Sequence, residues 1–498
     1  MRMDTHVVVA GWGQVTQPKE ADNPRDVPGL MDQAARQAGR TLTDPSILSK
    51  LDGILVVRPL SAHCPDAPAR LAKALGATPG FTHLSDIGGN SPQTLINLAG
   101  SLIARNRLER VLVVGAEAYV RRNPGTSRPD SALLKGVPLD YAGDDARGTL
   151  PLETRHGIQH PMQGFPLFET ALWHASGLTL ADYLHRTGRM WSQFSRVAAG
   201  HPFAWSKIPR TAEEIVTPAP DNRPVAFPYT KFMNAFITVD QAAAVILMSE
   251  KASRETRKKD QPPVYFAGGG YATDRQRFMV QKSDFTVSVP MKTVMDKALD
   301  RSGFTLEDMD CFDLYSCFPC AVSIARKMAG LTEDDSRPLT LTGGLGFFGG
   351  PGNNYNLHAV ATLAEQIADG RYRTGMVTAL GWFMHKHAAG IYSSRRPEKS
   401  LAGTAEADHA DPLAGPGPVP VDETPSGKGV IDTYTVVYHP DHTPAYGVIY
   451  GRTDQGNRFV ANTVNDPDVY TALTGHDMIG TTVRLSHDPV KKTATAVI

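Results

Sequence analysis

The sequence contains one long internal repeat, and this feature restricts the possible fold more than any other. Residues 88–117, "GGNSPQTLINLAGSLIARNRLERVLVVGAE", resemble residues 349–381, "GGPGNNYNLHAVATLAEQIADGRYRTGMVTALG", at a spacing of about 264 residues. Each copy runs from paired glycines through small polar residues into a helix-like segment, a basic turn and an apolar strand. A duplication on this scale predicts two similar halves, each with a loop that enters a helix N-terminus.

Short apolar runs alternate with helix-like segments through residue 400, which predicts an α/β fold with largely buried strands. Residues 121–230 interrupt this alternation, since they are rich in Pro, Gly, Arg and His and have weak periodicity. We expect an inserted loop domain there, of the kind that shapes a pocket. The predicted halves are residues 1–250, which include the insertion, and residues 251–395.

The pattern changes again near the C-terminus. Residues 396–428 are polar, rich in Pro, Gly and Ala, and without an apolar period, so they are interpreted as a linker. Residues 429–498 contain five strand-like runs of alternating polar and apolar residues with turns between them. This spacing predicts a small antiparallel β-barrel of the OB type.

The charge balance and the hydropathy exclude several classes of partner. Lys plus Arg equals Asp plus Glu, 51 against 51, which gives no electrostatic case for nucleic acid or an anionic membrane. Four cysteines are too few for a disulfide scaffold. The chain has no apolar run of about 18 residues, and its first residues resemble a buried strand rather than a signal peptide. We therefore expect a cytoplasmic protein.

The glycine-rich loop in the second copy has three interpretations. "GLGFFG" at 344–349 matches the dinucleotide fingerprint, but "GPGNN" follows it and prevents a helix there, and no Gly-Lys-Ser/Thr follows. A purely structural turn is the second interpretation. The duplication favours the third, in which two such loops meet near a pseudo-twofold axis and point helix N-termini at one site. Such N-termini stabilise an oxyanion or an anionic group.

Four short motifs lie in the order found in the thiolase superfamily. "SDIGGNSPQTLINLAGSLI" falls at the nucleophile loop, "DLYSCFPC" at the N-E-A-F or H-D-C-F loop, "GGLGFFGGPGNN" at the G-H-P loop and "TALGWFMHKHAAG" at the late loop. Residues 5–395 thus resemble a thiolase. The resemblance implies a duplicated thiolase fold with layers αβαβα.

The C-terminal segment extends this resemblance. "GRTDQGNRFVANT" resembles the OB-like domain that thiolase-like proteins of type 1, relatives of the sterol-carrier thiolases, carry in addition. The resemblance implies a protein of lipid metabolism, similar to an acetyl-CoA acetyltransferase, that binds CoA or an acyl-CoA. It implies no other cofactor and no metal.

The motifs depart from the family at the residues that carry its chemistry. Gly89 lies at the nucleophile position, Gly350 at the G-H-P histidine and Tyr315 at the histidine of the second loop. Thiolysis needs a thiolate and an oxyanion hole, so ordinary turnover is not expected. The expected substrate-binding residues are Gly89, Asn90, Ser91, Gly349, Gly350 and Gly381. Ser91 has no visible base beside it to activate its hydroxyl.

Cys317, Tyr315 and Tyr355 are candidate catalytic residues. Cys317 matches a family cysteine that is thought to move a proton; with Cys320 it could instead be a buried apolar residue, a zinc half-site or a redox pair. Two phenols in one pocket could cleave a β-hydroxyacyl-CoA by a retro-aldol reaction, one taking the hydroxyl proton while the other holds the thioester oxygen.

His385 is the fourth catalytic candidate, as a spare base in a site without its usual histidine. A satisfied structural histidine is the alternative, as for His387 beside it. Four basic residues of the insertion could bind CoA phosphates or form a solvated surface: Arg121, Arg122, Arg128 and Lys135.

Two functions therefore remain open. The first is a carrier, sensor or weak acyltransferase that binds CoA or an acyl-CoA without efficient thiolase turnover. The second is a C–C lyase that uses the tyrosines. The barrel lacks the basic stripe with aromatic residues that single-stranded nucleic acid requires. A homodimer or a monomer is expected.

Overall fold

The computed structural model describes residues 5–120, 148–401 and 413–498. Ten strands in these ranges form one mixed sheet in the order β3-β2-β4-β7-β1-β8-β11-β10-β9, with β12 added beside β8. The strands of the first half are β1 (Val7–Thr16), β2 (Gly53–Val56), β3 (Phe81–Leu84), β4 (Arg110–Ala118) and β7 (Asp240–Ser249). Those of the second half are β8 (Tyr265–Asp274), β9 (Cys311–Asp313), β10 (Thr374–Gly381), β11 (Lys386–Ser393) and β12 (Leu413–Ala414).

The strand pairing confirms the duplication. In the first half β2 is parallel to β4, while β4–β7 and β7–β1 are antiparallel. In the second half β9 is parallel to β10, while β10–β11 and β11–β8 are antiparallel. The two halves join edge to edge where Val7 and Val8 of β1 pair with Phe266 and Tyr265 of β8.

The central helices repeat at the spacing predicted from the sequence. Helices α3 (Ser91–Ala104) and α11 (Tyr355–Ala368) begin 264 residues apart, and each has 14 residues. Aligning these helices places Gly88 opposite Gly352, three residues later than Gly349, with which the sequence repeat aligned it. Both helices contact strands of both halves, so they form a layer between the two parts of the sheet.

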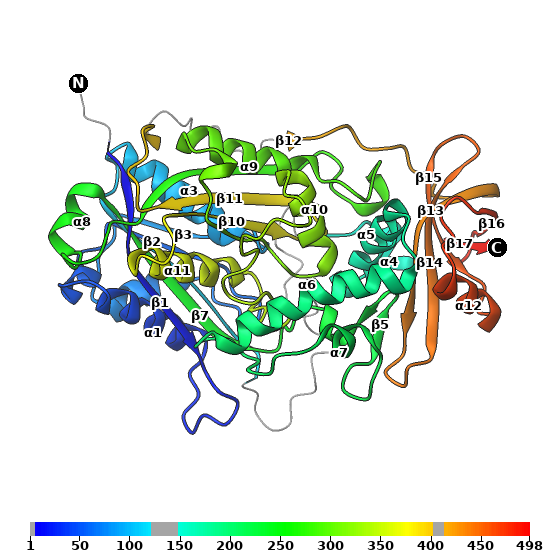
Figure 1. Ribbon diagram of the computed structural model, residues 1–498, viewed down its shortest axis with the longest axis horizontal. Helices are drawn as coiled ribbons and strands as arrows, with labels where there is room; N and C mark the ends of the chain where they lie inside the picture. Colours follow the sequence, from blue (N-terminus) through cyan, green and yellow to red (C-terminus); the bar gives the residue numbers. More distant parts are fainter. Residues whose placement is uncertain (1–4, 121–147, 402–412) are drawn as a thin grey trace.

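Further helices cover the outer faces of the sheet. Helix α1 (Val27–Arg40) packs on β1, β7 and β4, while α9 (Val289–Ser302) packs on β8 and β11, with α10 (Pro319–Ala329) beside it. The layers are therefore αβαβα, as the resemblance implied (Figure 1). Two shorter helices complete this region: α2 (Ala67–Leu75) and α8 (Glu250–Thr256).

The described part of the insertion corrects one expectation. A loop domain was expected over 121–230, but residues 148–230 contain α4 (Pro151–Arg155), α5 (Pro161–Ser176), α6 (Leu180–Gly200) and α7 (Ala212–Val216). The periodicity was weak because α5 is buried along consecutive residues and α6 buries polar Thr187 and Ser195 among its apolar residues. The hairpin strands β5 (Pro224–Ala226) and β6 (Tyr229–Thr230) follow.

The C-terminal region is a closed five-stranded barrel with the strand order β14-β15-β17-β16-β13 and a β13–β14 pairing that closes it. Its elements are β13 (Gly427–Tyr438), β14 (Pro444–Thr453), β15 (Arg458–Thr463), α12 (Pro467–Gly475), β16 (Thr482–Asp488) and β17 (Thr493–Val497). The prediction of purely antiparallel strands was wrong for one pair, because β15 and β17 run parallel.

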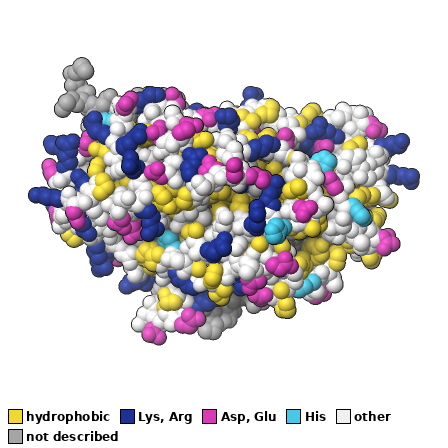
Figure 2. All heavy atoms as spheres, in the orientation of Figure 1, with side chains coloured by type: hydrophobic (Ala, Val, Ile, Leu, Met, Phe, Trp, Pro, Cys, Tyr) yellow, Lys and Arg dark blue, Asp and Glu magenta, His cyan; other side chains and the backbone are white. Residues whose placement is uncertain are grey.

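The barrel lies beyond the inserted helices, at the opposite end of the molecule from α8 (Figure 1). Helix α5 and strand β5 both contact β13, so the insertion holds the barrel. Part of the expected linker lies along the core, since Leu413 and Ala414 pair with β8. Basic and acidic side chains are interspersed over the face seen in Figure 2, in line with the balanced charge. Within the described residues, no helix has the length and hydropathy of a membrane span.

Candidate functional site

The two glycine loops meet, as the duplication predicted. The backbone N–H of Gly88 donates to Oδ1 of Asn353 (3.0 Å), and Nδ2 of Asn353 donates to the carbonyl of Arg58 (2.9 Å). One carboxamide from the second half thus holds the loop that precedes α3 in the first half. The N-termini of α3 and α11 lie on either side of this contact.

Gly89, at the nucleophile position, faces Tyr315. A Cβ placed on Gly89 would overlap the Tyr315 hydroxyl oxygen and the Leu380 carbonyl oxygen. The space that a side chain of residue 89 would need is therefore filled by a phenol from the other half. This contact explains why residue 89 is glycine, although its φ is not in the left-handed region.

The neighbouring residues Asn90 and Ser91 have different surroundings. The Ser91 hydroxyl donates to the Asp86 carbonyl (2.9 Å), so its proton is held by backbone and not by a base. Asn90 is buried, and its Oδ1 has no hydrogen-bond partner among the described residues. A Cβ on Gly381 would overlap this same Oδ1, so Gly381 provides the space that the carboxamide occupies.

Tyr315 is positioned by the end of β9 and by Thr378, whose Oγ1 accepts its backbone N–H (2.9 Å). Its ring meets the ring of Tyr355 edge to face at a centroid distance of 5.6 Å. Burial raises the pKa of the Tyr315 phenol, and Cys317 adds to the shift. Tyr315 therefore remains a protonated hydrogen-bond donor at neutral pH.

Tyr355, the first residue of α11, is fully buried, and its hydroxyl belongs to a polar network. The hydroxyl donates to Oδ1 of Asp313 (3.1 Å) and lies 2.6 Å from Oγ1 of Thr342. Asp313 also accepts backbone N–H groups of Leu341 (2.8 Å) and Thr342 (3.2 Å). Burial raises the pKa of the Asp313 carboxyl, whereas these donors lower it. Asp313 was missed by the sequence analysis, although an aspartate between apolar residues at a strand end was a usable signal.

Both cysteines of the "CFPC" segment are buried free thiols. Burial raises the pKa of the Cys317 thiol, so it is protonated at neutral pH and is a poor nucleophile. The Sγ of Cys320 donates to the Phe165 carbonyl (3.6 Å), and burial raises its pKa as well. Burial outweighs the nearby hydrogen-bond donors that lower these pKa values, so neither thiol is activated.

His385 precedes β11 and is buried beside the ion pair between Lys282 and Asp274 (2.7 Å). Burial and the nearby Lys282 lower the pKa of His385, so the ring is neutral, and its Nδ1 has no partner among the described residues. His387 lies 3.1 Å from the Ser288 hydroxyl, and burial lowers its pKa to about 3. The hydrogen bonds of this region connect these histidines to β8 and α9, not to Tyr315.

Gly349 and Gly350 contact residues of the first half that follow the insertion. Gly349 has φ +118°, and a Cβ there would overlap the Gln241 side chain. The N–H of Gly350 donates to the Phe236 carbonyl (2.8 Å). The four basic residues of the insertion named above lie outside the described residues.

A second buried acid lies beside Gly352, close to the start of α11. A Cβ on Gly352 would overlap the Glu117 carboxylate, which accepts the N–H groups of Leu60 (2.8 Å) and Ser61 (2.7 Å). Burial raises the pKa of Glu117 to about 7, against the opposing effect of these donors. Glu117 was not predicted from the sequence, because a single glutamate at the end of an apolar strand belongs to no motif.

The comparisons with known proteins agree with this architecture. Residues 413–489 match the family model for the additional C-terminal domain of thiolase-like protein type 1. No curated protein matches the chain. Among solved structures, a monomeric SCP2-thiolase-like protein type 1 from Mycobacterium smegmatis is 30% identical over 99% of both chains, with a TM-score of 0.83.

Two more distant structures share the fold alone. An aldolase, Ltp2-ChsH2(DUF35), is 18% identical with a TM-score of 0.61, over 80% of this chain and all of that one. An acetyl-CoA acetyltransferase from Syntrophomonas wolfei is 16% identical with a TM-score of 0.55, over 79% of this chain and all of that one. Because the relative at 30% identity spans both chains almost completely, this chain belongs to the SCP2-thiolase-like proteins of type 1.

Proposed function

We propose that the protein binds a CoA thioester where the N-termini of α3 and α11 meet, and forms no covalent acyl intermediate at residue 89. The observation that supports this proposal most directly is that the Tyr315 hydroxyl fills the space that a side chain at residue 89 would need. A thiolase needs a thiolate at that point, whereas a protonated phenol offers a hydrogen bond to the thioester oxygen.

The other nucleophiles nearby do not replace the cysteine. The Ser91 hydroxyl is bonded to backbone, and Cys317 is a buried, protonated thiol. The N–H groups of the first helical turns and the Tyr315 hydroxyl suit the partial negative charge of a polarised thioester carbonyl. These groups support binding and polarisation rather than acyl transfer, so the protein serves as a carrier or sensor.

A retro-aldol lyase is the second candidate, supported by the contact between the rings of Tyr315 and Tyr355. In that reaction a base takes the β-hydroxyl proton, and the Cα–Cβ bond breaks to give a carbonyl compound and a thioester enolate. The enolate is then protonated at Cα. Tyr315 would hold the enolate oxygen, and Tyr355 would pass the hydroxyl proton towards Asp313.

Calorimetric titration with CoA and acetyl-CoA, followed by mass spectrometry of the protein and the products, tests both candidates. We expect binding, an unchanged protein mass and no product. An acetyl group on a peptide that contains Ser91 or Cys317 would contradict the proposal. Tyr372, a half-buried tyrosine in the turn between α11 and β10, provides the control. Cleavage of a β-hydroxyacyl-CoA that is lost in Tyr315→Phe but retained in Tyr372→Phe would select the lyase.

A further inference from the structure

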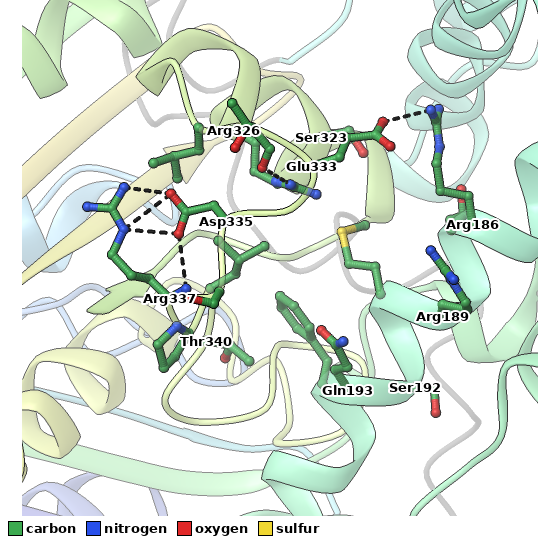
Figure 3. A pocket seen from close by; sticks show the side chains of 18 of the residues that line it. Arg186, Arg189, Ser192, Gln193, Ser323, Arg326, Glu333, Asp335, Arg337 and Thr340 are labelled. Atoms are coloured by element: carbon green, nitrogen blue, oxygen red, sulfur yellow. Dashed lines mark hydrogen bonds and ion pairs between the residues drawn. The ribbon is translucent and has the colours of Figure 1, made fainter. Parts of the chain in front are cut away.

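A large cavity outside the loop junction has a pronounced excess of positive charge. It has a volume of about 1240 Å³, above the usual range for small-molecule pockets, and lies between α6, α10 and residues 331–340 (Figure 3). Six basic residues line it: Arg186, Arg189, Arg196, Arg326, Lys327 and Arg337. Only two acidic residues, Glu333 and Asp335, line it as well.

Each acid is already paired with one arginine of the wall. Glu333 binds Arg186 (2.7 Å), and Asp335 binds Arg337 (2.6 Å). Figure 3 shows these pairs at opposite sides of the cavity, with Arg189 on the same helix as Arg186. The two pairs are neutral together, so the remaining basic residues give the cavity its net positive charge.

Two of these arginines have neither an ion pair nor a hydrogen bond within the described part of the chain: Arg189 and Arg196, both exposed. Arg189 and Arg196 follow Arg186 by three and ten residues along α6, and all three lie on the helix face that lines the cavity. Like charges on one helix face repel each other, so the arrangement favours an anionic ligand that neutralises them. The Nε of Arg326 is also buried, with no hydrogen-bond partner among the described residues.

The cavity shares a wall with the polar network at Tyr355. Thr340 lines the cavity, and its hydroxyl donates to Oδ2 of Asp313 (3.2 Å), which is bonded to Tyr355. Phe194 lines the cavity too, and a Cβ on Gly344 would touch its ring and the Ser316 hydroxyl. A ligand in the cavity would therefore lie next to the buried side of the proposed thioester site.

We propose that this cavity binds the phosphate groups of a multiply phosphorylated nucleotide, with Arg189 and Arg196 as the main contacts. Guanidinium groups bind phosphate oxygens in pairs of charge-assisted hydrogen bonds, and several phosphates match the number of unneutralised cations. The phosphates come either from the CoA portion of the thioester or from a free nucleotide. The first of these two sources rests on the proposed function.

The test compares wild type, Arg189→Gln/Arg196→Gln and Arg70→Gln by calorimetry with CoA, dephospho-CoA, ATP and pyrophosphate. Arg70 is an exposed control on α2, whose nearest carboxylate is Asp66 at 3.9 Å. Both cavity arginines are exposed, so the double variant should fold, and thermal unfolding checks this. We expect an affinity at least about tenfold weaker in the double variant, with a shallower dependence on salt, and no change in Arg70→Gln.

The outcomes separate this proposal from the proposed function. If every probe that binds wild type also binds the folded double variant equally, the cavity proposal is wrong, while thioester binding stands if CoA is among those probes. If ATP or pyrophosphate binds through the two arginines but CoA does not, the cavity proposal holds with a free nucleotide and the proposed function fails. If none of the four probes binds wild type, the cavity proposal is overturned.

Discussion

The N-termini of α3 and α11 occupy equivalent places in the two halves, yet they differ in chemistry. At α3 the space beside Gly89 is filled by the Tyr315 phenol, and at α11 the space beside Gly352 is filled by the Glu117 carboxylate. In each case the polar group comes from the other half. The carboxylate is fixed by two backbone donors, whereas the Tyr315 hydroxyl is a protonated phenol that can donate a hydrogen bond to a ligand. The start of α11 is therefore structural, whereas the start of α3 is suited to a ligand.

The largest effect is expected at the structural helix start. In Gly352→Ala the new methyl group would overlap the buried Glu117 carboxylate at a φ of +52°, so we expect a loss of roughly 2–4 kcal/mol in the free energy of unfolding. Urea unfolding measures it. Gly370→Ala is the control, since φ is +76° there with open space around the Cβ. Equal losses in both variants would disprove the packing argument.

The charge of Glu117 gives the next prediction. Burial raises its pKa from 4.5 to about 7, so between these values the native state keeps a proton that the unfolded chain has lost. Its contribution to stability falls as pH rises through this window. The glutamine side chain in Glu117→Gln cannot ionise. The difference in free energy of unfolding between variant and wild type should therefore shift in favour of the variant by roughly 2 kcal/mol from pH 5 to pH 8. A difference that does not change with pH would refute this reading.

A double-mutant cycle tests the other helix start. Gly89→Ala should destabilise the protein by roughly 1–3 kcal/mol, because its methyl group would overlap the Tyr315 hydroxyl. Tyr315→Phe removes that oxygen, so the double variant should recover about 1 kcal/mol of the loss. The Leu380 carbonyl still opposes the methyl group, so recovery is incomplete. Strict additivity of the two changes would show that the contact is absent.

The smallest effect is expected for Tyr355→Phe. The change removes one donor from Asp313, which keeps the N–H groups of Leu341 and Thr342. We expect a loss of about 1 kcal/mol in the free energy of unfolding. Thermal unfolding of Tyr355→Phe, with Tyr372→Phe as the control, measures this loss. A gain in stability would contradict the role given to this network.

The sequence predicted the duplication, the two helix starts and the barrel, because glycine pairs and apolar runs repeat at long range. It missed the helices of the insertion, since α5 buries consecutive residues and so has no period. It also selected Tyr355 without Asp313, which accepts the hydrogen bond of its hydroxyl. Asp313 and Glu117 depend on backbone donors that come from distant segments, and only the folded chain brings these together.

We propose that Tyr315 polarises a bound thioester without covalent chemistry. The most direct test is carbon-13 NMR of acetyl-CoA labelled at its carbonyl and bound to wild type, Tyr315→Phe and Tyr372→Phe. We predict a downfield shift of the bound carbonyl in wild type and Tyr372→Phe that is absent in Tyr315→Phe. The same shift in all three proteins, or a protein-bound acyl signal that survives removal of the ligand, would contradict the claim.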